Sequence, residues 1–277
     1  SDFLLMQNIS QTLAGRVAVT RLLPLSISEL KEDANIDTNT LMWKGFYPGV
    51  WGDGKDPGNV YDSYVSTYLQ RDVRQILNIK DLSLFQKFLT IVASRVGNVF
   101  IASSIASELG VDYKTIQSWM SILETSYTAF LLQPFHRNIG KRMTKTPKVY
   151  FYDVGLACHL LGIENEQHIK THPLRGAIFE NMVVCEMLKK RYNQGHKSNL
   201  FFYRDQTTEV EVIQEEANKI KAYEIKSAER FNQEFTKSLS YVQKLFGDDI
   251  SSSYIIYSGK EEMTFKNFSL INYHNIK

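Results

Sequence analysis

The order of helical and strand patterns in the last third of the chain constrains the fold more than any other part of the sequence. Within 209–213 and 222–226, apolar residues alternate with charged ones, as in strands that bury one face. Strand patterns lie at 200–204, 209–213, 221–226 and 253–257, and helical patterns lie at 175–191 and around 231–246. The resulting order, α-β-β-β-α-β, predicts a compact mixed α/β sheet with helices.

The middle third is helical and then changes to two strands. Apolar residues recur at three- and four-residue steps across 61–96. Two shorter helical patterns follow, at 103–109 and 112–123, and Gly110 supplies the turn of a helix-turn-helix between them. Strand patterns at 127–132 and 148–152 would complete a winged helix.

The first sixty residues have mixed patterns. A helix is predicted at 4–13, a strand at 17–23, and a helix start at Ser26, which has Glu29 three residues later as in a capping box. The stretch 46–59 is rich in glycine and proline, which favours a loop and a hinge. Three parts are therefore predicted: 1–60, 61–152 and 153–277.

Composition excludes several classes of protein. With 43% hydrophobic and 22% charged residues, the chain is neither disordered nor a coiled coil. A net charge of +2 indicates no partner by itself. The two cysteines, Cys158 and Cys185, are too few for a disulfide scaffold, and no apolar run approaches the roughly 20 residues of a membrane span. We therefore expect a cytoplasmic protein without a membrane segment.

Two motifs imitate a nucleotide-binding site. Residues 49–56 follow most of the phosphate-loop pattern, but Asp56 stands where Ser or Thr should hold magnesium, and Pro57 follows instead of a helix pattern. Asp153 follows an apolar strand pattern at 149–152, as in the magnesium-binding strand of ATPases. Without a phosphate loop, we interpret the apolar segment as a core strand and Asp153 as a capping residue.

The predicted winged helix offers a candidate DNA-binding surface. Between its two strands, Arg137, Lys141, Arg142 and Lys145, followed by Lys148, occur with no acidic residue. The outer face of the second helix adds Lys114 and Gln117, together with Tyr113 and Ser118. Because Glu108 and Asp112 offset the single lysine of the helix pair, DNA contact and a pure packing role both stay open.

Acidic residues in the last third suggest a metal site. Strand alternation puts Glu224 and Lys226 on one face, and Glu209 and Glu211 on one face of the preceding strand. If these strands pair, Glu211 and Glu224 could bind Mg²⁺ while Lys226 positions a water, with Glu180 contributed by the preceding helix. This pattern predicts a restriction-endonuclease-like fold. The alternative is a solvated sheet face with a Glu–Lys ion pair.

Short motifs across nearly the whole chain resemble one known family. They are Leu13-Ala14-Gly15-Arg16, Leu23-Pro24-Leu25-Ser26, Tyr68-Leu69-Gln70-Arg71-Asp72, Phe151-Tyr152-Asp153-Val154-Gly155-Leu156, Gly176-Ala177-Ile178-Phe179-Glu180-Asn181, Phe202-Tyr203-Arg204, Glu209-Val210-Glu211 and Glu224-Ile225-Lys226. Together they resemble prokaryotic AAA-type ATPases whose C-terminal half is a domain of unknown function, often compared with PD-(D/E)XK nucleases.

This resemblance implies a parent protein that binds ATP and includes an N-terminal ATPase core missing from this chain, and an oligomer of that parent is a further expectation. The phosphate loop of that core should precede Ser1, so this chain alone should not hydrolyse ATP. The family commonly has Asp where this sequence has Glu211, which puts cleavage in doubt. The rival hypotheses are an active Mg²⁺-dependent endonuclease, a non-enzymatic DNA-binding module, and a protein-interaction arm.

Overall fold

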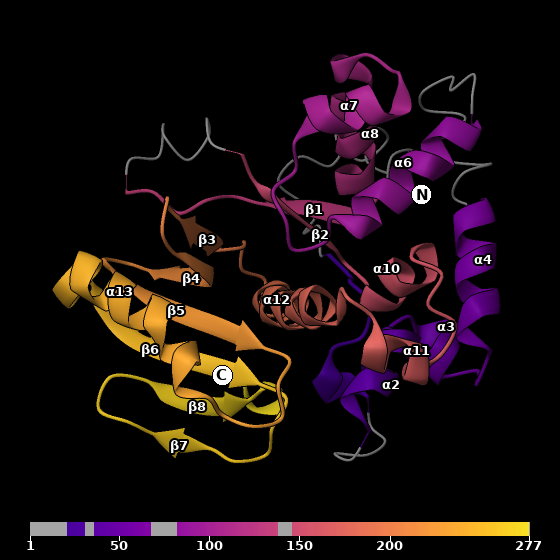
Figure 1. The fold of residues 1–277 in the computed structure, drawn as a ribbon. Coiled ribbons are helices and arrows are strands. Elements are labelled where there is room, and N and C mark those ends of the chain that lie inside the picture. The colour runs from indigo at the N-terminus through magenta and orange to yellow at the C-terminus, as the bar shows by residue number, and fades with distance from the viewer. Residues whose placement is uncertain (1–20, 31–35, 68–81, 138–145, 277) are drawn as a thin grey trace, which may run out of the picture.

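The computed structural model describes residues 21–30, 36–67, 82–137 and 146–276. It has the mixed α/β fold expected from the sequence, with a helical N-terminal region followed by a sheet with helices. Figure 1 shows the C-terminal sheet on one side of the molecule and most helices on the other. The predicted helix at 4–13 lies outside the described residues, as do residues 17–20 of the predicted strand.

The C-terminal sheet has six strands in the order β3-β4-β5-β6-β8-β7. The first three strands are antiparallel neighbours, whereas β6 is parallel to both β5 and β8. The predicted α-β-β-β-α-β order is confirmed, and two further strands follow it. The strands are β3 (Leu200–Arg204), β4 (Glu209–Glu216), β5 (Lys219–Lys226), β6 (Ile250–Tyr257), β7 (Met263–Thr264) and β8 (Ser269–Asn272).

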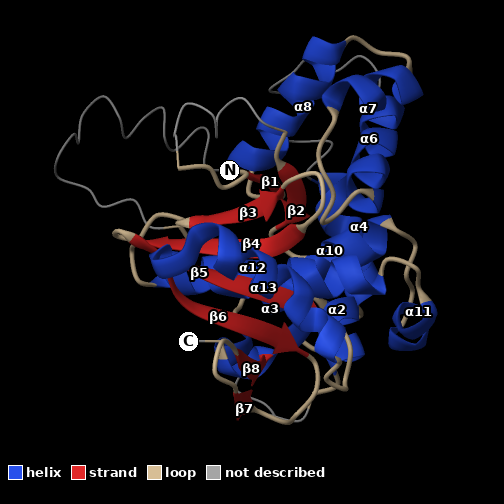
Figure 2. Ribbon diagram, turned by 60° about the vertical axis from the view of Figure 1, so that its left-hand side comes forward, coloured by secondary structure: helices blue, strands red, loops and turns tan. Residues whose placement is uncertain are grey.

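Helices cover both faces of this sheet (Figure 2). On one face, α12 (Arg175–Asn193) packs on Val212 and Ile225 in the larger hydrophobic cluster. On the other, α13 (Lys237–Phe246) follows a 3-10 turn (Gln233–Thr236) and contributes Leu239 and Val242 to a second cluster. Burying an apolar helix stripe against each face is the main stabilising term of such a layer.

The middle third is a winged helix, as predicted. Gly110 ends the first helix of the helix-turn-helix with a left-handed φ of 66°, and Asp112 caps the second by accepting from Lys114 N. Val99 adds an isolated antiparallel β-bridge to Lys148, at the start of the second strand. The elements are α6 (Leu82–Ser94), α7 (Ala102–Leu109), α8 (Tyr113–Thr125), β1 (Ala129–Leu132) and β2 (Lys148–Phe151).

The chain that leaves β1 joins the winged helix to the sheet. Phe135 N donates to Phe202 O at 2.5 Å, and Phe202 N donates to Gln133 O at 3.1 Å. Residues 133–135 therefore cover the outer edge of β3, which would otherwise expose unpaired backbone groups.

A helical layer precedes and follows the winged helix. The prediction of a loop at 46–59 is wrong in part, because helices occupy 48–51 and 57–59 and Phe46 is buried. The hinge stays a prediction. Residues 49–56 belong to a helix and the turn after it, so the resemblance to a phosphate loop is accidental. The helices are α2 (Thr38–Lys44), α3 (Pro48–Trp51), α4 (Pro57–Thr67), α10 (Val154–Leu160) and α11 (Glu166–Thr171).

Asp153 connects this layer to the winged helix. Its buried carboxylate caps α10 by accepting from Leu156 N at 3.0 Å, which confirms the capping role. It also accepts from Phe46 N and from the Tyr61 hydroxyl, each at 2.7 Å. The larger hydrophobic cluster contains residues of α2, α8 and α12, so it runs through all three predicted parts. The three-part division itself stays a prediction.

Candidate functional site

Three residues of the predicted acidic site meet on neighbouring strands. Lys226 Nζ lies 2.8 Å from Glu211 Oε1 and 2.6 Å from Glu224 Oε1. The two carboxylate oxygens are therefore at most 5.4 Å apart, the sum of those distances. Ser238 Oγ of α13 also donates to Glu224, and Ile225 N donates to Glu211 at 3.3 Å.

Strand register places these side chains together. The β4–β5 pairing matches Val212 with Tyr223, and the next residues along the two strands are Glu211 and Glu224. Lys226 lies two residues beyond Glu224, so it projects from the same face of β5. Alternation in the sequence predicted the face of each side chain, and the β4–β5 pairing supplies the condition on which the predicted group depended.

Glu180 has a different partner from the one expected. From α12 it accepts from Lys148 Nζ at 3.1 Å and from the Tyr150 hydroxyl at 2.5 Å, and both donors belong to β2 of the winged helix. A Cβ on Gly97 would lie 3.6 Å from its carboxylate oxygens. No hydrogen bond or ion pair joins Glu180 to Lys226 within the described ranges. The helix glutamate therefore contacts the winged helix.

Lys148 is the residue that the sequence interpretation missed. It was grouped with the basic wing, but its side chain is only 1% exposed and pairs with Glu180 and Glu209. A β-bulge explains why Glu209 and Glu211 bind different lysines, since β4 has one extra residue between the pairs that it forms with Phe201 and Tyr203 of β3. We call the whole set the glutamate–lysine cluster: Lys148, Glu180, Glu209, Glu211, Glu224 and Lys226.

Burial and mutual repulsion perturb the acids of this cluster. Burial, followed by the charge of Glu211, raises the pKa of Glu224 to about 8, against the opposing effect of Lys226. Burial also raises the pKa of Glu180, although Lys148 opposes that shift. Burial disfavours charge on both lysines, but the surrounding carboxylates outweigh it and raise the pKa of Lys148 and of Lys226.

The cluster is a poor fit to Mg²⁺ in this arrangement. Magnesium requires about six oxygen ligands at roughly 2.0–2.1 Å in octahedral geometry. Within the described parts of the chain, no group of three or more His, Cys, Asp or Glu side chains is placed to hold a metal ion. The ammonium of Lys226 binds one oxygen of each carboxylate at the point where a shared cation would lie. The magnesium site therefore stays a prediction. The side-chain positions of Glu211, Glu224 and Lys226 do not favour metal binding there.

The predicted DNA-binding residues have separate locations. Lys114 and Gln117 are exposed on α8, as is Tyr113, whose side chain is 47% exposed. Arg137 forms an ion pair with Asp249 and lies over the Phe246 ring, so it contacts the sheet domain. Lys141, Arg142 and Lys145 lie outside the described residues.

A hollow of about 450 Å³ lies beside α8. Tyr113 and Gln117 line it from the helix, Ile101 lines it from the start of α7, and Pro147 lines it from the residue before β2. Ile101, like Tyr113, is an exposed apolar side chain at this surface. The outer surface of the winged helix is therefore open and has both aromatic and polar side chains.

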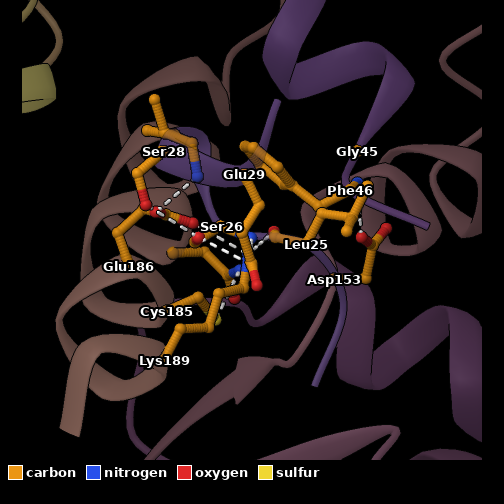
Figure 3. A network of polar contacts seen from close by, with 12 residues as sticks. Leu25, Ser26, Ser28, Glu29, Gly45, Phe46, Asp153, Cys185, Glu186 and Lys189 are labelled. Atoms are coloured by element: carbon orange, nitrogen blue, oxygen red, sulfur yellow. Dashed lines mark hydrogen bonds and ion pairs between the residues drawn. The ribbon is translucent and has the colours of Figure 1, made fainter. Parts of the chain in front are cut away.

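A separate polar network attaches the N-terminal segment to α12 (Figure 3). The buried Lys189 donates to Leu25 O at 2.7 Å and to Glu186 Oε1 at 2.8 Å, and its ammonium lies 4.0 Å from the centre of the Phe46 ring. Glu186 Oε2 accepts from Ile27 N at 2.8 Å. These contacts hold the backbone of the segment before α2.

Comparison with known proteins identifies two regions of the chain. Residues 35–167 match the family model described as Domain of unknown function (DUF8612), and residues 175–276 match that described as Domain of unknown function (DUF4143). The second match covers α12 and the six-stranded sheet. The expected resemblance to a domain of unknown function is thus confirmed for the C-terminal part, and neither description mentions an ATPase or a nuclease.

The curated relatives are distant. Uncharacterized protein Rv2008c of Mycobacterium tuberculosis and Uncharacterized protein Mb2031c of Mycobacterium bovis are each 28% identical over 180 residues, covering 64% of this chain and 40% of the relative. An uncharacterized protein of Haemophilus influenzae is 22% identical over 206 residues, covering 69% and 50%. The chain thus spans half or less of the length of these relatives. No solved structure matches it.

None of the helices in the described ranges is both long enough and apolar enough to cross a bilayer.

Proposed function

We propose that this chain is the DNA-contacting part of a longer ATPase, and that it binds duplex DNA through α8 and the wing without cleaving it. The ATPase part of this proposal comes from the sequence resemblance, and ATP would be used only by the parent protein. The sheet domain serves as a nuclease-like scaffold that holds the winged helix.

The outer face of the winged helix carries this proposal. The exposed side chains of α8 from Tyr113 to Ser121 include one lysine and no acid, together with Gln117 and two serines. Lys141, Arg142 and Lys145 follow in the sequence between β1 and β2 with no acidic residue among them, whereas Lys148 is buried and Arg137 pairs with Asp249. A polar helix face beside a basic wing suits a phosphate backbone, because each lysine or arginine contact releases condensed counterions.

The glutamate–lysine cluster supports a scaffold role. Lys148 belongs to the winged helix, whereas Glu180 and Glu209 belong to the sheet domain, so their ion pairs cross between the two units. Within the sheet, the Lys226 ammonium contacts both Glu211 and Glu224. An arrangement that satisfies its acids with lysines favours a fixed interface over metal-dependent cleavage.

A binding titration with a labelled duplex tests the proposal. Lys114→Ala combined with Gln117→Ala should weaken binding about tenfold or more, since one phosphate contact and one polar contact are lost. The slope of log affinity against log salt should become shallower by roughly 0.9 for the lost phosphate contact. Lys170→Ala is the matched control, because Lys170 is an exposed lysine on α11, outside the winged helix.

The outcomes separate the rival hypotheses. Equal affinity of the double variant and the Lys170 variant would mean that α8 does not contact DNA. A wild-type chain that binds no duplex at low salt would support the protein-interaction arm instead.

A further inference from the structure

A second hollow, of about 290 Å³, lies between β1, α12 and β3, and we call it the β1 hollow. Phe130 lines it from β1, Tyr192 lines it from α12, and Leu200 lines it from β3. Its volume is at the lower end of the range for ligand pockets. The β1 hollow therefore suits a ligand of the size of one long side chain.

Glu124 is the charged residue of this hollow. It belongs to the last turn of α8, is partly buried, and also lines the hollow beside α8. Burial raises the pKa of its carboxyl, and a hydrogen bond from the backbone of Leu131 opposes that shift. Within the ranges that the structure describes, no lysine, arginine or histidine forms an ion pair with Glu124. A desolvated carboxylate therefore lines the hollow without a cation.

Another part of the molecule shows the same combination with its cation in place. Lys189 Nζ lies 2.8 Å from Glu186 Oε1 and 4.0 Å from the centre of the Phe46 ring. There a carboxylate and an aromatic ring hold one buried lysine of the fold itself. The β1 hollow has the carboxylate and the rings, and its size leaves room for a cation from outside.

The rim of the β1 hollow already holds one guanidinium. Arg21 Nη1 donates to the Tyr192 hydroxyl at 3.1 Å, and Arg21 Cζ lies 5.1 Å from the centre of the Tyr192 ring. Because Tyr192 also lines the hollow, the rings at this place are suited to a planar cation. The carboxylate of Glu124 would repel a phosphate, so this hollow is distinct from the proposed DNA contact.

We propose that the β1 hollow binds a guanidinium group carried on an apolar stem, with the cation on Glu124 and the stem against Phe130 and Tyr192. An arginine side chain of another polypeptide and a free alkylguanidine share this chemistry. Either ligand would bury its methylene groups against the rings and supply the charge that Glu124 lacks. The inference does not depend on the proposed DNA binding.

Calorimetric titration of the full chain with N-acetyl-arginine amide tests the proposal, and a dissociation constant in the millimolar range is expected for a ligand of this size. N-acetyl-citrulline amide has a neutral urea in place of the guanidinium, so it should bind at least tenfold more weakly. Agmatine distinguishes the two sources. Tighter binding of the blocked arginine than of agmatine would assign the site to a polypeptide side chain, and equal affinity would assign it to free guanidines.

A substitution at Glu124 tests the residue itself. Glu124→Gln keeps the shape and removes the charge, so it should weaken binding of N-acetyl-arginine amide at least tenfold. It should not lower the melting temperature, because a partly buried charge without a counter-ion is lost. Glu229→Gln, at an exposed position after β5, is the matched control and should bind as wild type does.

Three results would overturn the proposal. They are the absence of saturable binding to the wild-type chain up to about 20 mM ligand, equal affinity for the citrulline and arginine compounds, and wild-type affinity in Glu124→Gln. The comparison of the two compounds uses the wild-type chain, so it holds even for a variant that fails to fold.

Discussion

Replacing Lys148 by methionine should reveal how strongly the glutamate–lysine cluster joins the winged helix to the sheet domain. The lysine side chain is 1% exposed, and methionine keeps much of its volume without the charge. Removing the lysine leaves the Tyr150 hydroxyl as the hydrogen-bond partner of Glu180 within the described ranges. Glu209 then keeps a longer ion pair of 3.4 Å with Arg204.

The expected loss is large for a single substitution. Breaking a buried ion pair by removing one partner costs about 3–5 kcal/mol, because an uncompensated charge stays buried. For a chain of this size, each kcal/mol lowers the melting temperature by about 2–4 °C, so a decrease of roughly 6–20 °C is expected. Lys170→Met, at an exposed site on α11, should change the free energy of unfolding by no more than about 0.5 kcal/mol.

Thermal unfolding followed by circular dichroism measures this effect, and a second substitution tests its cause. Adding Glu180→Gln to Lys148→Met removes the uncompensated carboxylate, so the double variant should recover about 0.5–3 kcal/mol relative to additivity. Equal melting temperatures for Lys148→Met and Lys170→Met would refute the reasoning. So would strict additivity of the two cluster substitutions.

Two further substitutions test the packing and the electrostatics. Gly155→Ala should destabilise the fold by several kcal/mol in a urea titration, as overpacking substitutions do. The added Cβ would lie 2.3 Å from the Tyr61 hydroxyl and 2.7 Å from Gly45 Cα. The control is Gly176→Ala, at a helical site with open space, which should be neutral or stabilising in the same titration. Burial and a neighbouring carboxylate raise the pKa of Glu224 from 4.5 to about 8, so the folded state keeps a proton that the unfolded chain releases between those values. The free energy of unfolding should therefore fall as pH rises through that window, and a Glu224→Gln variant with the same slope as wild type would contradict this assignment.

The sequence predicted much of the fold because its local patterns agree with the tertiary structure. Period-two alternation placed β4 and β5 and brought Glu211, Glu224 and Lys226 to one face. The glycine turn at Gly110 located the helix-turn-helix. These features depend on neighbouring residues and on strand parity, which are visible in one sequence.

The remaining features depend on contacts between distant segments. The glycine-rich stretch around Pro48 and Pro57 forms short helices because prolines start them and tertiary packing holds them. Lys148 looked like a wing residue, since nothing local shows that Glu180 and Glu209 would surround it. The bulge in β4, which separates the partners of Glu209 and Glu211, also has no marker in the sequence.

Incubation of the wild-type chain with a labelled duplex, in Mn²⁺ and in EDTA, tests the central proposal most directly. Binding and strand integrity are read from the same samples over a series of salt concentrations. The account predicts salt-dependent binding in both conditions, with a negative slope of log affinity against log salt, and intact DNA throughout. Cleavage that appears only with Mn²⁺, or the absence of any salt-dependent binding, would contradict it.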